Sequence, residues 1–371
     1  MKRILFITQN LNRTGSEMVL WYLLNSLDPK EYAIYVFCFK KGELYDQLPE
    51  HIQKSILYKA SGKWDKKLGR ALLKLVKADQ LAHQLNYIQA HFKPDFWYVN
   101  TMIIPDVHRI AASLNVKVVT HFHELLYVYS LIRSFQMESI INNSAVCIGC
   151  SEEVCSHLIN MGHPNVQLQP SFIDFTTINV DHNKVNALKQ KLGITASDFV
   201  WVISGSATYM KGVDYVLPIL DRFKEEQVKI LWLGSLPDDG LLYYVKEVVE
   251  RRYKGKLFFL GPQADDYYNY MAIGHGFLLL SREESFSLVL LEAAYLGIPI
   301  VTFNIGIAPT FVKKGMGRVI NSREIEDIVL EMKWLHDHPQ QDLLELKNAA
   351  LAFSLPKQVA NFERLIAKLF P

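Results

Sequence analysis

Short apolar runs and amphipathic stretches alternate along the whole chain. The apolar runs are nearly continuous in Val, Ile, Leu and Phe, which is typical of parallel strands buried on both faces. Six runs lie in the first half, at 3–8, 32–39, 96–100, 117–123, 145–151 and 166–171, and six in the second, at 200–206, 229–235, 257–262, 276–281, 298–303 and 318–320. Helical patterns lie between them, as at 17–27, 212–225 and 241–253. This alternation predicts an α/β fold.

A polar, weakly patterned segment, 172–197, separates the two sets of runs. With 371 residues, the chain has the length of about two domains. We therefore predict a first Rossmann-like domain over 1–175 and a second over 185–355, with a last helix after Pro356 that can pack on either domain. Ligands of such sheets bind beyond the carboxyl ends of the strands, so site residues are expected there.

Composition and charge narrow the class of protein. Half of the residues are apolar, which is enough for sizeable cores. No apolar run approaches the length of about 18 residues that a membrane-spanning helix needs. The net charge of +2 argues against a dedicated nucleic-acid binder. The apolar run at the N-terminus is too short for a signal peptide, and we interpret it as a strand.

The four cysteines are Cys38, Cys147, Cys150 and Cys155. Cys147 and Cys150 form a C-x-x-C pair, but no second pair of Cys or His lies at zinc-ligand spacing. The pair lies inside an apolar run, which favours buried reduced thiols on a strand over a redox or metal site. Reduced thiols indicate a cytosolic protein.

The segment 281–299 is the most informative stretch of the sequence. A predicted strand ends where it begins, a loop follows, and a helix is predicted from Ser287 as N-cap to Gly297 at its C-terminus. Glu284 then lies on a loop at the carboxyl end of a strand. Free backbone amides at the start of the helix suit a phosphate. Glu292 lies about one and a half turns into the helix, where a carboxylate can bind the paired hydroxyls of a ribose.

Both glutamates could instead be solvated surface charges, because two Glu residues eight positions apart occur by chance in a chain of this length. Glu292, however, lies among Leu291, Ala293 and Ala294, where a solvated charge is unusual. This context favours a functional pair.

Glu284 and Glu292, in the setting E-S-F-S-L-V-L-L-E-A, resemble the E-x7-E motif of GT-B retaining glycosyltransferases of the family 4 type. The resemblance covers nearly the whole chain. It implies two Rossmann-like domains that face a cleft, the C-terminal one binding a nucleoside-diphosphate sugar and the N-terminal one the acceptor, with no metal or other cofactor. It also implies that the last helix, 356–371, crosses back to the N-terminal domain.

Two glycine loops resemble further parts of the donor site of this family. Gly15, before the helix that follows the first strand, resembles the loop near the donor phosphates, although one glycine of the usual pair is missing. The stretch 205–212, G-S-A-T-Y-M-K-G, resembles the loop that opens the second domain. Its Lys211 would stabilise the negative charge of the departing diphosphate. Many relatives carry Arg at the position of Ser206, and Arg282 is a candidate for the missing charge.

A His-x-His pair, His121 and His123, closes a predicted strand of the first domain. Both rings then share one face of the strand, which raises the question of zinc, but no third ligand is evident. In the family the second His faces the donor sugar. The resemblance therefore assigns that role to His123, whereas we expect His121 to be structural. Asn100 and Thr101, after the preceding strand, are expected to rim the cleft.

The resemblance thus assigns a full set of site residues. The catalytic candidates are His123, Glu284 and Lys211. The donor-binding candidates are Gly15, Gly205, Ser206, Lys211, Arg282, Phe286, Ser287, Leu288, Val289 and Glu292. No metal ligands are among them.

A basic segment, 54–77, carries eight Lys and Arg residues and one acid, Asp65. Its second half has a helical pattern with most cations away from the apolar face. Three interpretations stay open: peripheral contact with an anionic membrane, an ordinary solvated helix, or a site for an anionic acceptor. With membrane contact, the protein would work in the cytoplasm at the inner face of the membrane.

The reaction that the resemblance implies is transfer of a sugar from a UDP- or GDP-sugar to a hydroxyl of a glycan or glycolipid, with retention and without metal, as in polysaccharide biosynthesis. The sequence has no D-x-D, G-x-S-x-G, P-loop or full G-x-G-x-x-G, which counts against metal-dependent transferases, hydrolases, NTPases and dinucleotide-binding enzymes. Two alternatives remain. One is another enzyme on the same fold, such as a sugar-nucleotide epimerase, and the other is a non-catalytic subunit that binds a partner.

Overall fold

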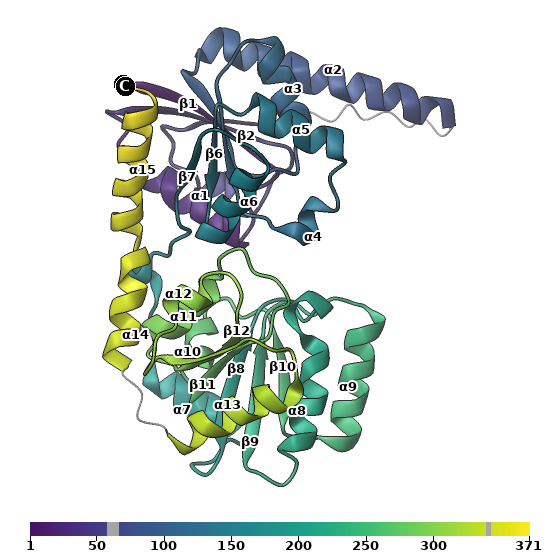
Figure 1. The fold of residues 1–371 in the computed structure, drawn as a ribbon, viewed down its shortest axis with the longest axis vertical. Coiled ribbons are helices and arrows are strands. Elements are labelled where there is room, and N and C mark those ends of the chain that lie inside the picture. The colour runs from purple at the N-terminus through teal and green to yellow at the C-terminus, as the bar shows by residue number, and fades with distance from the viewer. Residues whose placement is uncertain (58–66, 339–342) are drawn as a thin grey trace. The chain divides into compact units, whose positions relative to one another are not determined.

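The computed structural model describes residues 1–57, 67–338 and 343–371, apart from the side chains of 67–79. The described residues form two compact units: unit 1 comprises Met1–Ser171 and Gln358–Pro371, and unit 2 comprises Phe172–Lys357. Each unit is built around one parallel sheet with helices on both faces (Figure 1). The predicted fold of two Rossmann-like domains is therefore confirmed.

Unit 1 holds a seven-stranded sheet in the order β3-β2-β1-β4-β5-β6-β7, and every neighbouring pair is parallel. Its strands are β1 (Lys2–Thr8), β2 (Tyr32–Cys38), β3 (Gln53–Ile56), β4 (Phe96–Val99), β5 (Val118–Phe122), β6 (Val146–Gly149) and β7 (Val166–Leu168). Its helices are α1 (Gly15–Ser26), α2 (Lys67–Phe92), α3 (Asp106–Ser113), α4 (Leu126–Tyr129), α5 (Ser134–Asn143) and α6 (Glu152–Asn160). The central strands β4 and β5 are buried throughout, because helices cover both faces of the sheet.

Unit 2 holds a six-stranded parallel sheet in the order β10-β9-β8-β11-β12-β13. Its strands are β8 (Phe199–Ser204), β9 (Val228–Leu233), β10 (Leu257–Gly261), β11 (Gly276–Leu279), β12 (Ile300–Phe303) and β13 (Gly317–Ile320). Its helices are α7 (His182–Lys191), α8 (Val216–Arg222), α9 (Gly240–Arg252), α10 (Tyr267–Met271), α11 (Leu288–Tyr295), α12 (Ala308–Phe311), α13 (Ile325–Asp337) and α14 (Leu343–Ala350).

In both sheets the strand order reverses at one point, between β1 and β4 in unit 1 and between β8 and β11 in unit 2. Loops that leave two such strands run to opposite faces of the sheet and open a crevice between them. The predicted site loops follow these four strands and β5, the neighbour of β4. The topology of each unit therefore brings its own candidate residues to one place.

Two elements differ from the sequence-based expectation. Strand β3 was not predicted, because its sequence, Q-K-S-I, lacks a continuous apolar run and lies at the edge of the sheet with most side chains half-buried. The helix expected over 212–225 is shorter, since Gly212 takes a left-handed φ of +78° and two single turns precede α8.

Residues 172–175, predicted to end the first domain, and residues 176–184, predicted to lie between the domains, all belong to unit 2. Phe172 and Ile173 are buried there, and Ile173 forms a parallel bridge with Ser354. The Phe175 ring stacks on Tyr295 with centroids 4.5 Å apart. A few apolar side chains in a polar segment are enough to attach it to the neighbouring core.

Helix α15 (Leu355–Leu369) starts before Pro356, because proline fits the first turn of a helix, where its missing N–H is not needed. From Gln358 onward its residues pack on unit 1. The Phe362 ring lies 5.6 Å from that of Tyr98, and Phe370, just beyond the helix, contributes a second aromatic contact to the same unit.

All four cysteines are free, and Cys38, Cys147 and Cys150 are buried. Burial raises the pKa of the Cys38 and Cys147 thiols to about 12, so both stay protonated at neutral pH. Among the helices that the structure describes, none combines the length and the apolar composition that crossing a membrane requires.

Candidate functional site

Two loops at the carboxyl edge of the unit 2 sheet lie against each other. The loop 205–212 follows β8, and the loop that starts at Ser281 follows β11. The backbone N–H of Arg282 donates to the carbonyl of Met210 at 2.8 Å. Gly212 approaches Leu280 so closely that a side chain at position 212 would overlap its carbonyl oxygen. Only glycine therefore permits this contact.

Lys211 and Glu284 form an ion pair across these loops. Lys211 Nζ lies 2.5 Å from Glu284 Oε1, and Ser281 Oγ donates to the same oxygen at 2.6 Å. The Glu284 side chain is only 11% exposed. The stem of Lys211 passes over Gly205. The structure thus brings three predicted site residues together, and the ammonium keeps hydrogen atoms for a further anionic partner, because it carries three donors.

Arg282 has a different partner from the one that the sequence suggests. Its guanidinium forms a two-pronged pair with Asp214, at 2.9 and 2.7 Å, and lies 3.6 Å above the centre of the Tyr209 ring. Such forked pairs are strong and fix the arginine in place. Asp214 therefore already balances this charge, which argues against Arg282 as the replacement for the cation missing at Ser206.

A second arginine near this loop was not predicted. Arg323, after β13, donates to the carbonyls of Ser281 and Arg282 at 2.9 Å each. Its guanidinium also lies over the Phe303 ring, 4.2 Å from the centre. Within the described residues no carboxylate lies at ion-pair distance from it. Sequence reasoning missed Arg323 because it follows a different strand from the motif that it supports.

Helix α11 begins at the predicted place but without the predicted cap. Ser287 occupies the N-cap position with φ +84°, and its Oγ is buried without a partner among the described residues. The prediction that the Ser287 side chain caps the helix is therefore wrong. The backbone amides of Leu288 and Val289 donate no hydrogen bond to this side chain. A non-glycine residue in this conformation costs energy and is common at binding sites. The Phe286 side chain is buried against Phe353, so it belongs to the core.

Glu292, on the next turns of α11, is held by two tyrosines of α10. Tyr267 donates to Oε2 at 2.8 Å, and Tyr268 donates to Oε1 at 3.1 Å. Burial raises the pKa of Glu292 to about 7, and the two hydroxyls partly oppose this rise. Tyr267 and Tyr268 follow the loop after β10, at the carboxyl edge of the sheet. This position is the sequence signal that could have identified them as site residues.

In unit 1, His121 and His123 lie at the end of β5 with ring centroids 3.9 Å apart, so the two rings are neighbours, as predicted. His121 Nδ1 is 2.6 Å from the Tyr98 hydroxyl and is buried, which suits a structural histidine. His123 Nε2 lies 3.2 Å from Asn100 Oδ1. Burial lowers the pKa of His123 to about 3, so its ring is neutral.

Asn100 also connects His123 to the first glycine loop. Its Nδ2 donates to the carbonyl of Ser16 at 3.3 Å, next to Gly15 at the start of α1. Gly15 is exposed. The loops after β1, β4 and β5 therefore place Gly15, Asn100 and His123 at one edge of the unit 1 sheet.

Glu124 is a further member of this cluster that the sequence analysis did not select. One of its carboxylate oxygens accepts the backbone N–H of His123 at 2.9 Å, and the other accepts the hydroxyl of Thr101. Burial raises the pKa of Glu124 to about 7, although these hydrogen bonds oppose the rise. Its position directly after His123 was the signal that could have identified it.

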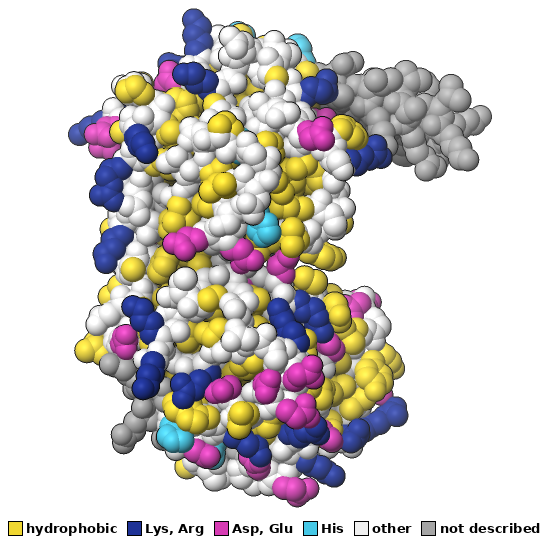
Figure 2. Space-filling model, in the orientation of Figure 1, with side chains coloured by type: hydrophobic (Ala, Val, Ile, Leu, Met, Phe, Trp, Pro, Cys, Tyr) yellow, Lys and Arg dark blue, Asp and Glu magenta, His cyan; other side chains and the backbone are white. Residues whose placement is uncertain are grey.

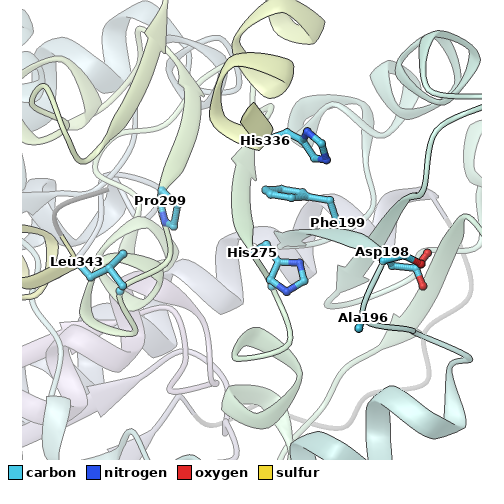
Figure 3. A pocket seen from close by; sticks show the side chains of 10 residues that line it. Ala196, Asp198, Phe199, His275, Pro299, His336 and Leu343 are labelled. Carbon is cyan, nitrogen blue, oxygen red and sulfur yellow. The ribbon is translucent and has the colours of Figure 1, made fainter. Parts of the chain in front are cut away.

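A separate pocket of about 460 Å³ lies at the opposite, amino edge of the unit 2 sheet. Phe199, which starts β8, stands between the rings of His275 and His336 (Figure 3). The carboxylate of Asp198 points away from these rings and pairs with Lys229 at 3.1 Å. Within the part of the chain that the structure describes, no three His, Cys, Asp or Glu side chains converge as metal ligands.

The basic segment 54–77 falls mostly outside the described residues. Residues 58–66 are not described, and of α2 only the backbone is described up to residue 79. Lys54, on β3, donates to the carbonyl of Tyr45 at 3.0 Å. Membrane contact through this segment stays a prediction.

On the visible face of unit 2, basic and acidic side chains are interspersed (Figure 2).

Two family models match the chain. Glycosyltransferase Family 4 matches residues 13–176, and Glycosyl transferases group 1 matches residues 184–353. Together they cover most of both units. The chain belongs to the family 4 type of glycosyltransferases. The resemblance drawn from the two glutamates and the glycine loops is thereby confirmed.

A curated relative of this glycosyltransferase is N-acetyl-α-D-glucosaminyl L-malate synthase from Bacillus anthracis, which is 28% identical over 178 residues. The match covers 47% of this chain and 45% of the relative, so it spans about half the length of that protein.

Solved structures share the whole fold of the glycosyltransferase. HepE from Anabaena, in complex with UDP and glucose, has a TM-score of 0.81 at 19% identity and covers 99% of this chain and 100% of its own. Sucrose-phosphate synthase from Thermosynechococcus elongatus has a TM-score of 0.79 at 13% identity and covers 100% of this chain and 99% of its own. These likenesses identify the fold as GT-B.

Proposed function

We propose that this glycosyltransferase moves a sugar from a nucleoside-diphosphate sugar, UDP- or GDP-linked, to a hydroxyl of a glycan or glycolipid, with retention and without a metal. The observation that carries the proposal is the arrangement at the carboxyl edge of unit 2. An ammonium held by Glu284, uncapped helix amides and the Glu292 carboxylate lie on adjoining loops and helices. These groups suit a diphosphate and the paired hydroxyls of a ribose.

In this proposal Lys211 and the amides of Leu288 and Val289 stabilise the diphosphate as the glycosidic bond breaks. Negative charge grows on the leaving phosphate, and fixed donors stabilise it without reorganisation. Glu284 holds Lys211 in place and accepts sugar hydroxyls with its remaining oxygen. Neutral His123 in unit 1 contacts the donor sugar as a hydrogen-bonding group rather than as an acid.

Retention follows in this proposal from attack on the same face of the sugar as the leaving group. The departing phosphate then takes the proton of the acceptor hydroxyl. The protein contributes positioning and electrostatic stabilisation, so it needs no carboxylate nucleophile. Position 206 is Ser, where many relatives carry Arg. Lys211 and the helix amides must therefore supply most of the stabilisation of the leaving phosphate.

Donor screening tests the proposal. UDP- and GDP-sugars are added in EDTA, and both the melting temperature and slow hydrolysis are followed. We expect one of them to stabilise the protein and to be hydrolysed. Glu292→Ala should abolish binding, whereas His123→Ala should spare binding and lose turnover. Glu247→Ala, at an exposed pair on α9, is the matched control.

Each alternative function has a distinct outcome. If no nucleotide sugar shifts the melting temperature, the chain is a non-catalytic subunit and the proposal fails. If a nucleotide sugar is converted into its epimer with no acceptor present, the chain is an epimerase. An acceptor panel then separates glycans, glycolipids and small hydroxy acids, the last included because the name of the curated relative specifies malate.

A further inference from the structure

The hydroxyl of Tyr267 lies between two other polar groups of unit 2. It is 2.7 Å from Ser204 Oγ and 2.8 Å from Glu292 Oε2. Ser204 is the last residue of β8 and is buried, Tyr267 starts α10, and Glu292 lies on α11. One phenol therefore joins three elements at the carboxyl edge of the sheet.

The direction of these hydrogen bonds follows from the charge of Glu292. An ionised carboxylate only accepts hydrogen bonds, so Tyr267 must donate to it. The oxygen of Tyr267 then accepts the hydroxyl hydrogen of Ser204. The result is an ordered series in which Ser204 donates to Tyr267 and Tyr267 donates to Glu292.

Tyr268 fixes the other side of the same carboxylate. Its hydroxyl bonds Oε1 at 3.1 Å, and its ring lies edge-on to that of Tyr267 with centroids 5.0 Å apart. Each carboxylate oxygen has about two lone-pair positions. With one position on each oxygen used by a tyrosine, one on each remains, in a fixed orientation, for a pair of neighbouring hydroxyls.

We propose that Tyr267 is a positioning residue of the nucleotide site, which orients the Glu292 carboxylate and keeps it ionised for the paired hydroxyls of a ribose. This inference rests on the proposed function. It adds a residue that neither the motif nor the glycine loops contain. Its consequence is that the tyrosine pair of α10 sets the pH range over which the nucleotide binds.

The charge balance around Glu292 explains this consequence. Burial favours the protonated carboxyl, whereas the hydroxyls of Tyr267 and Tyr268 favour the ionised one. The pKa of about 7 places the two forms in balance near neutral pH. Tyr267 and Tyr268 are the titratable side chains that the structure places in hydrogen-bond contact with Glu292. Removal of one donor therefore moves the pKa of Glu292 upward.

The test is calorimetric titration with UDP and with GDP between about pH 6 and about pH 9, on the wild type and on Tyr267→Phe. We expect the better nucleotide to bind the variant about tenfold more weakly at pH 7, the size of one hydrogen bond to a charged group. We also expect the pH midpoint of binding to move upward. Tyr243→Phe, at an exposed tyrosine of α9, is the matched control and should leave both unchanged.

Each result has a separate meaning. If the wild type binds neither nucleotide, the proposed function fails. If the wild type binds and Tyr267→Phe keeps its affinity and midpoint, the inference fails. A loss of affinity by the same factor at every pH also overturns it, because that is what a merely structural tyrosine would give. Should Tyr267→Phe not fold, Ser204→Ala removes the donor to Tyr267 and should move the midpoint upward by less.

Discussion

Gly212→Ala should disrupt the contact between the two loops of the unit 2 site. Gly212 has a φ of +78°, which alanine adopts at a cost of about 1 kcal/mol. The added Cβ would also overlap the carbonyl oxygen of Leu280 and lie 2.9 Å from its Cβ. The first of these neighbours is backbone at the end of β11, so it cannot rotate away. Overpacking of this kind costs about 1–3 kcal/mol.

Together these terms lower the free energy of unfolding of unit 2 by about 2–4 kcal/mol, which corresponds to a fall in melting temperature of about 5–15 °C. Nucleotide binding should suffer as well, because Lys211 precedes the substituted residue and Ser281 follows Leu280. A shift between the two loops lengthens the ion pair of Lys211 with Glu284. The assay is therefore a thermal melt of the free protein combined with a UDP titration.

Gly240→Ala is the control for this experiment. Gly240 is the first residue of α9, has no left-handed φ, and has no atom within 4 Å of the position of an added Cβ. We expect that variant to keep the wild-type melting temperature or to exceed it slightly, since alanine favours helix. If Gly212→Ala melts within about 1 °C of Gly240→Ala and binds UDP equally well, the close approach to Leu280 is not a constraint and the reasoning is refuted.

Two further predictions concern single charges. Lys211→Met should lower kcat of sugar transfer by about 10²–10³ with a smaller change in KM, because the leaving phosphate loses its fixed cation. The control is Lys254→Met, at an exposed ion pair. Equal losses of kcat for both variants in steady-state kinetics would contradict the prediction. Since burial raises the pKa of Glu124 from 4.5 to about 7, its contribution to stability is complete below 4.5 and is lost as the pH rises through 7. Glu124→Gln should therefore reduce the wild-type fall in urea stability between about pH 5 and about pH 8, and an unchanged profile would argue against a buried carboxyl.

The parallel sheets could be predicted from the sequence because buried strands leave continuous apolar runs. Strand β3 could not be predicted in this way, because an edge strand needs no continuous apolar run. Its sequence, Q-K-S-I, has only one large apolar side chain. The same limit applies to 172–184, where three apolar residues in polar surroundings attach the segment to unit 2. Local composition predicts the interior of a sheet better than its margins.

The site could be predicted as far as its motif extends. Glu284, Lys211 and Gly205 come together as expected, because the loops after β8 and β11 meet at the reversal of strand order. The partners of Arg282 and Glu292 could not be predicted. Asp214 and Tyr267 lie in other parts of the sequence, and their pairing depends on side-chain directions that a spacing pattern does not contain.

The two glutamates of the motif differ in chemistry because they differ in partners. Glu284 shares one oxygen with an ammonium and a serine hydroxyl, so its charge is balanced on the side where a diphosphate would arrive. Glu292 meets only neutral phenols among the contacts that the structure gives it, and burial without a cation raises its pKa to about 7. A carboxylate poised in this way gains most from hydroxyl donors, and each further donor favours the ionised form. Binding of a ribose would therefore release a proton from Glu292 near neutral pH.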